Sequence, residues 1–147
     1  MKVIDMHTHI FPEKIAAKAT VATAEYFDLP EPPNHYGSTG ELLEVLRRAS
    51  IDYAMVFSAA TTAHQVEHMN RYILSQAREH PQLIPCGTLH AEYEGFREEL
   101  AWMRENGIFG VKLHPEFQHF VLDDERLFPM VEEMERQDMF LIAHMGD

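Results

Sequence analysis

Short apolar runs alternate with longer stretches of helical periodicity along the chain. The apolar runs predict strands over 2–7, 52–58, 83–89, 109–114 and 139–144. The periodic stretches predict helices over 13–27, 39–50, 62–79, 93–106 and 123–137. Several of the strands are apolar at consecutive positions, which is typical of parallel strands buried on both faces. Regular strand–helix alternation of this kind indicates an α/β fold.

Two α/β architectures fit this alternation, an open doubly wound sheet and a (βα)8 barrel, and the pattern alone does not choose between them. No glycine-rich phosphate loop follows a strand, so a dinucleotide or nucleoside triphosphate site has no support. A long proline-rich loop over 28–38 separates the first two helices, and its length suggests a functional role. Its candidate substrate contacts are Glu31, Asn34, His35 and Tyr36.

Composition narrows the class of protein. The chain has 12 Lys+Arg against 24 Asp+Glu, a net charge of −12, which disfavours nucleic acid and anionic membrane surfaces as partners. No apolar run approaches the roughly 18 residues of a membrane span. Cys86 is the single cysteine, which favours a reducing compartment, and we expect a cytoplasmic protein. The 147 residues correspond to one domain, expected over 1–147.

The first candidate site is Asp5-Met6-His7-Thr8-His9, at the end of the first predicted strand. Side chains alternate along a strand, so the two imidazoles share a face and can reach one divalent metal ion. Zinc is the first expectation, with manganese, iron and nickel as alternatives. Among ten histidines an H-x-H pair also arises by chance. Its position favours a metal site, because barrel active sites are built at the C-terminal ends of strands.

Two later strands end in further candidates. His144 follows the fifth predicted strand, where it is either a hydrogen-bonded core histidine or a third metal ligand beside an open water position. Lys112 and His114 share a face of the fourth strand and are the candidate catalytic residues. Burying an unpaired lysine is costly. An inward Lys112 would therefore bind a substrate anion, form an ion pair or carry a metal-bridging carbamate, whereas a register shifted by one residue would turn it outward.

These residues carry a resemblance to a known family. The segment DMHTHIFP at 5–12 resembles the first-strand signature of the amidohydrolase superfamily. GVKLHP at 110–115 and IAHMG at 142–146 resemble its amidohydrolase-related branch, which includes aminocarboxymuconate-semialdehyde decarboxylase and aromatic-acid decarboxylases. The resemblance implies a metal-dependent TIM barrel with His7 and His9 as first-strand ligands and His144 as the fifth-strand ligand. Lys112 is placed like the lysine that is carbamylated in binuclear members, but this branch is usually mononuclear and the modification is not assigned.

The activity implied by the resemblance is metal-dependent hydrolysis of a C–N or C–O bond in a small polar substrate. The alternative is decarboxylation of an unsaturated or aromatic carboxylate. Asp5 favours hydrolysis, because aromatic-acid decarboxylases often carry glutamate at that position. The family's sixth-strand histidine and its aspartate after the eighth strand have no counterpart here, which leaves the source of the catalytic aspartate open.

The length predicts an incomplete barrel. A (βα)8 barrel takes about 250 residues, and five βα units are predicted here. Three explanations are open: a truncated chain without activity of its own, completion of the sheet by a second copy in a homo-oligomer, or a stable half-barrel. Apolar edges on the first and last strands would be exposed in a single copy.

Overall fold

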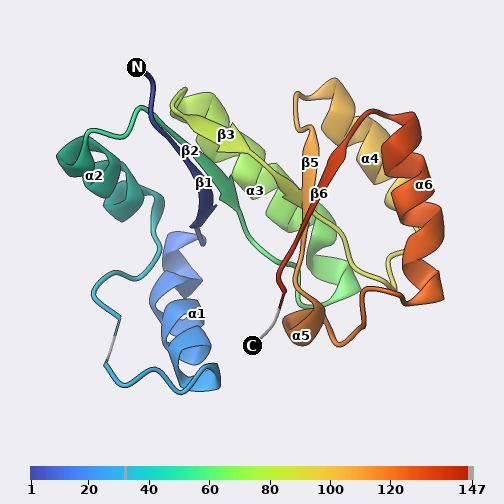
Figure 1. Cartoon of the computed structure of the whole chain (residues 1–147), viewed down its shortest axis with the longest axis horizontal. Helices are drawn as coiled ribbons and strands as arrows, with labels where there is room; N and C mark the ends of the chain where they lie inside the picture. The colour runs from blue at the N-terminus through green and yellow to red at the C-terminus, as the bar shows by residue number, and fades with distance from the viewer. Residues whose placement is uncertain (32, 146–147) are drawn as a thin grey trace.

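A computed structural model describes residues 1–31 and 33–145 of the chain (Figure 1). Gly146, the last residue of the IAHMG segment, lies outside the described residues. The strands are β1 (Ile4–His9), β2 (Tyr53–Phe57), β3 (Leu83–Pro85), β4 (Gly87–Thr88), β5 (Gly110–Leu113) and β6 (Phe140–Ala143). The helices are α1 (Glu13–Tyr26), α2 (Thr39–Ala49), α3 (Val66–Glu79), α4 (Phe96–Glu105), α5 (Pro115–Gln118) and α6 (Phe128–Arg136), with 3₁₀ turns η1 (Ala63–Gln65) and η2 (Glu125–Leu127).

All strand pairs are parallel, in the orders β1-β2-β3 and β4-β5-β6. β3 and β4 are consecutive pieces of one extended run. The Cys86 N–H between them still donates to the Val56 carbonyl at 3.0 Å. Each strand therefore lies beside the next one in the chain, which is the winding of a (βα)8 barrel and not the reversed order of a doubly wound sheet. The predicted α/β fold, an incomplete barrel of about five βα units, is confirmed.

Several boundaries differ from the sequence prediction for local reasons. The strand predicted over 83–89 is split, because Pro85 has no N–H to donate to a neighbouring strand. The helices predicted over 62–79 and 123–137 each begin with a 3₁₀ turn, and only later become α-helical. Between the strand predicted over 109–114 and the helix predicted over 123–137 lies the short helix α5, which begins at a proline whose fixed φ suits a first helical position.

The inner strands β2 and β5 are buried on both faces, as their apolar sequences predicted, whereas the outer strands β1 and β6 are partly exposed. On β2, Val56 packs with the cluster under α2 and α3, whereas Met55 and Phe57 belong to a separate inner cluster with Cys86. Alternate residues of β2 thus pack into two different hydrophobic clusters. Figure 1 shows α1 and α5 at the end of the sheet where the strands finish. None of the helices in the described ranges combines the length and apolarity needed to cross a membrane.

Candidate metal and substrate site

The end of β1 places two imidazoles on the inner side of the sheet. The pairing with β2 shifts register between Asp5 and Thr8, and the Asp5 carboxylate accepts the His7 N–H at 3.1 Å. The strand therefore continues to His9 through an irregularity, not through the uniform alternation that the sequence pattern assumed. Both rings contact Phe57 edge-on, with centroid distances of 4.8 and 4.7 Å, and lie 5.6 Å from each other.

The ends of β5 and β6 supply the next two imidazoles. His144 lies just beyond β6, where its N–H donates to the Leu113 carbonyl at 3.0 Å. His114 caps α5: its Nδ1 accepts the Phe117 N–H, and its own N–H donates to Gln118 Oε1 at 2.7 Å. The two imidazoles stack with centroids 4.1 Å apart and planes 9° from parallel. Backbone contacts of both residues thus position the rings.

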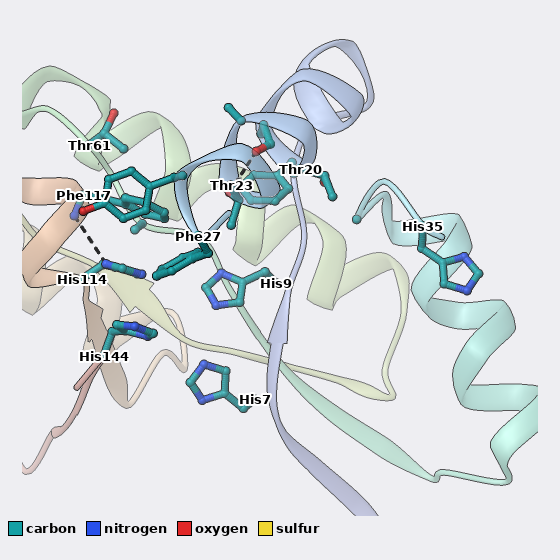
Figure 2. A pocket seen from close by; sticks show the side chains of 16 residues that line it. His7, His9, Thr20, Thr23, Phe27, His35, Thr61, His114, Phe117 and His144 are labelled. Atoms are coloured by element: carbon teal, nitrogen blue, oxygen red, sulfur yellow. Dashed lines mark hydrogen bonds between the residues drawn. The ribbon is translucent and has the colours of Figure 1, made fainter. Parts of the chain in front are cut away.

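Figure 2 shows the rings of His7 and His9 facing those of His114 and His144 across a common space. This space opens into a cavity of about 710 Å³. The cavity is lined by His7, His9, Phe11, Ala19, Thr20, Ala22, Thr23, Tyr26, Phe27, His35, Gly37, Ala59, Thr61, His114, Phe117 and His144. The tertiary structure therefore brings all four predicted histidines together, although their segments are far apart in the chain.

The upper wall of the cavity is aromatic and comes from α1 and α5. Tyr26 contacts Phe117 edge-on at a centroid distance of 5.0 Å. The ring centroid of Phe27 lies 5.8 Å from that of Phe117 and 5.9 Å from that of His144. No function was predicted for α1, although the Tyr-Phe pair immediately before the long loop could have indicated an aromatic wall. Of the loop residues predicted as substrate contacts, only His35 is among the described residues that line the cavity.

Lys112 is fully buried and faces the inner side of the sheet. Its Nζ lies 5.3 Å from the centre of the Phe57 ring and has no hydrogen-bond partner among the described residues. The outward orientation that a shifted register would produce is therefore wrong. So is the ion-pair role, within the part of the chain that the structure describes. Burial lowers the pKa of the Lys112 ammonium, because the charged form is deprived of water.

Three of these imidazoles, those of His7, His9 and His114, have a lowered pKa that favours the neutral form. Burial, followed by the Lys112 charge, lowers the pKa of His9 to about 3. Burial, followed by the nearby His144, lowers the pKa of His114 to about 4, and burial also lowers the pKa of His7. Neutral imidazole is the form that binds a metal ion, so no proton has to be displaced at pH 7.

One carboxylate joins this site that the sequence analysis missed. Glu116 Oε2 lies 3.8 Å from His144 Nε2, and both are buried atoms that have no hydrogen-bond partner in the described part of the chain. His114, Glu116 and His144 each offer a ligand atom within 4.8 Å of the others. A carboxylate oxygen and an imidazole nitrogen that are both buried and unsatisfied are two lone-pair donors, which a cation between them would satisfy, and imidazole with carboxylate suits zinc or manganese. The residues present therefore fit a divalent cation.

A parallel barrel-type sheet with histidines at the carboxyl ends of its strands is the arrangement in which TIM-barrel proteins build their active sites. The family model described as Amidohydrolase matches residues 4–147, and the chain belongs to this family. None of the curated proteins matches the sequence.

Solved structures share the fold at low sequence identity. IDCase from Metarhizium anisopliae, in apo form, has a TM-score of 0.75 and 17% identity, covering 97% of this chain and 50% of that one. A dihydroxybenzoic acid decarboxylase from Polaromonas sp. JS666, with bound manganese and the inhibitor 2-nitroresorcinol, has a TM-score of 0.70 and 14% identity. The match covers 100% of this chain and 50% of that one. A probable 2-pyrone-4,6-dicarboxylic acid hydrolase from Acinetobacter baumannii, with citric acid bound, has a TM-score of 0.65 and 16% identity. The match covers 99% of this chain and 50% of that one. The chain thus spans about half the length of these structures.

Proposed function

We propose that the chain is the metal-binding part of a hydrolase that cleaves a C–N or C–O bond in a small-molecule substrate. Residues 1–147 form one partial barrel domain in this proposal, and the metal is zinc. The single observation that carries it is the convergence of His7, His9 and His144 at the carboxyl ends of β1 and β6. Three imidazoles that bind one cation form a zinc ligand set that leaves room for water.

Each residue of the site would have a separate role. His7, His9 and His144 would hold the cation, which when bound supplies Lewis acidity and lowers the pKa of water. Burial lowers the pKa of His114 to about 4, so its ring is neutral at pH 7, and it stands beside His144, where it would face the cation or the substrate. Lys112 would supply positive charge beneath the site toward a substrate anion. The aromatic wall of Phe27 and Phe117 excludes water from the reacting end of the cavity.

A decarboxylase of an aromatic or unsaturated carboxylate is the second candidate. The aromatic wall favours it, because Tyr26, Phe27 and Phe117 form an apolar surface on which a flat ring can stack. A dihydroxybenzoic acid decarboxylase that binds manganese shares the fold, which supports manganese as the alternative ion. Both candidates use the same histidines, and they differ in the bond that breaks.

The test begins with the purified chain stripped of metal and reloaded with Zn²⁺ or Mn²⁺. Bound metal is measured by mass spectrometry. Turnover is assayed with 4-nitrophenyl esters and anilides, and with 2,6-dihydroxybenzoate for CO₂ release. The double variant His7→Ala/His9→Ala should lose the metal and any turnover, because two of the three imidazole ligands are gone. The matched control is His68→Ala, an exposed histidine on α3 that lies outside the cavity.

Each outcome separates the candidates. Metal-dependent ester or anilide cleavage supports the hydrolase, and CO₂ release without such cleavage supports the decarboxylase. Metal binding without either reaction means that the chain lacks activity by itself. Unchanged metal content and turnover in the double variant would sink the proposed site.

A further inference from the structure

Glu116 is the one acidic side chain that reaches the histidine cluster in the described structure, and neither the H-x-H pattern nor the strand-end rule predicts it. It is the second residue of α5, directly after the capping residue His114 and Pro115. The proline starts the helix at a defined position, and Gln118 fastens the helix to the sheet. The Gln118 amide donates to the Ala60 and Leu89 carbonyls at 2.7 and 2.6 Å. Glu116 is therefore carried on a fixed element.

The geometry between Glu116 and His144 leaves a gap suited to an ion. Their facing atoms, Oε2 and Nε2, are 3.8 Å apart, which is beyond the range of a good hydrogen bond. Both atoms are buried, and neither has a hydrogen-bond partner within residues 1–31 and 33–145. Two ligand atoms on one tetrahedral zinc ion are roughly 3.3 Å apart. Closing the gap by about half an ångström therefore brings both atoms into the first coordination sphere of a single cation.

His114 completes this ligand group. Its Nδ1 is used by the Phe117 N–H, so Nε2 is the nitrogen left for coordination. Its ring stacks on His144, and its ligand atom lies within 4.8 Å of those of Glu116 and His144. Three donors from the β5 and β6 ends thus surround one position from one side.

We propose that Glu116 is a carboxylate ligand of the cation at this site, on the β5–β6 side together with His114 and His144. This inference rests on the proposed metal function and deepens it, since it changes the ligand set from imidazoles alone to imidazoles with a carboxylate. A carboxylate neutralises one positive charge and is a harder donor than imidazole. Glu116 therefore widens the preference of the site from zinc toward manganese.

The experiment measures metal binding and needs no substrate. The metal-free chain is titrated calorimetrically with Mn²⁺ and with Zn²⁺, and the visible spectrum of the Co²⁺ form reports the coordination. Glu116→Gln keeps the size of the side chain and removes its charge. We expect its Kd for Mn²⁺ to rise at least tenfold, its Kd for Zn²⁺ to rise less, and the Co²⁺ spectrum to change. Glu116→Asp should restore part of the Mn²⁺ affinity.

The control is Glu125→Gln, an exposed glutamate on η2 that should bind both ions like the unaltered chain. Urea unfolding of each metal-free variant checks that the fold is retained. Unaltered Mn²⁺ affinity and an unaltered Co²⁺ spectrum in Glu116→Gln overturn the inference. If His7→Ala/His9→Ala then still loses metal, the proposed function stands without Glu116. If neither variant loses metal, both proposals fail.

Discussion

At the scale of single residues, the most informative side chain is Lys112. Its ammonium is fully buried, has no hydrogen-bond partner among the described residues and faces the aromatic ring of Phe57. An unpaired buried charge opposes folding. A residue that destabilises the fold and lies next to four imidazoles is the usual signature of a position kept for function.

Lys112→Met tests this reading of the lysine. Methionine fills a similar volume without a charge, so we expect the free energy of unfolding to rise by about 1–3 kcal/mol. Any turnover of the chain should fall at the same time. Urea denaturation measures the first effect, with exposed Lys14→Met as the control that should change stability by less than about 0.5 kcal/mol. A loss of stability in Lys112→Met would mean that the ammonium has a partner.

At the scale of elements, a buried polar network joins α3, α4 and β4 behind the candidate site. Glu99 on α4 accepts from Asn70 at 2.8 Å and from Arg71 at 2.6 and 3.0 Å. Asn70 in turn pairs with the backbone of Thr88, accepting its N–H at 2.7 Å and donating to its carbonyl at 3.1 Å. The network therefore anchors the short strand β4, whose neighbour β5 leads to His114.

Glu99→Ala should disrupt this anchor. The substitution leaves the Arg71 charge and the Asn70 amide without their shared acceptor, and breaking a buried ion pair costs about 3–5 kcal/mol. The adjacent Glu98→Ala is a matched control, because Glu98 is exposed on the same helix. Thermal unfolding of both variants measures the difference. Equal melting temperatures would contradict an anchoring role for Glu99.

The start of α2 carries a second feature that stabilises the fold. The Ser38 hydroxyl accepts the Glu41 N–H while the Glu41 carboxylate accepts the Ser38 N–H, which is a capping box. Glu41 also accepts the Tyr36 N–H, so the box secures the end of the loop that borders the cavity. Ser38→Ala should lower stability by about 1 kcal/mol. Exposed Ser75→Ala on α3 is the control for urea denaturation, and an equal effect in both variants would show that the cap has no special role.

At the scale of the whole molecule, apolar side chains are exposed on the two outer strands. On β1, Ile4 and Met6 are 46% and 54% exposed, and on β6, Phe140 and Leu141 are 43% and 39% exposed. Each strand pairs on one side only within the described residues. The solved structures that share the fold are about twice as long. Within the described residues, the outer edges of β1 and β6 are therefore open.

We expect the isolated chain to self-associate through these edges, because open apolar strand edges pair with other chains. Native mass spectrometry should show species above the 17.0 kDa of one copy and reports bound metal at the same time. Leu141→Lys should reduce the association, while Val131→Lys on the exposed face of α6 should not. A single 17.0 kDa species at micromolar concentration contradicts this expectation.

Stability should also depend on pH through the buried imidazoles. The pKa is about 3 for His9 and about 4 for His114 in the folded chain, against roughly 6.5 in the unfolded chain. The unfolded state therefore binds more protons between these values, and the metal-free chain should lose stability as pH falls from about 6.5 toward 4. Urea midpoints at pH 7.5, 5.5 and 4.5 measure the loss. His114→Asn, which keeps a capping side chain, should lose less than the unaltered chain, and exposed His68→Asn should lose the same amount.

Much of the fold could be predicted from local pattern. The strand–helix order and all five apolar runs follow from burial of alternate or consecutive apolar positions, which is a local property of the chain. The 3₁₀ starts of two helices were not predicted, because they depend on single hydrogen bonds and not on periodicity. The choice of barrel winding over a doubly wound sheet could not be read from the pattern either, since it depends on which strands become neighbours.

Part of the candidate site could likewise be predicted from the sequence, and part of it could not. His7, His9, His114 and His144 were predictable because each stands at the end of an apolar run, and the carboxyl ends of parallel strands meet at one edge of a sheet. Glu116, Phe27 and the aromatic wall were not predictable, because their contacts join segments that are far apart in the chain. By itself, the sequence determined the elements and the histidines at their ends. Only the tertiary structure decided that Lys112 is buried without a partner and that Glu116 faces His144, because burial and proximity are properties of the packed chain.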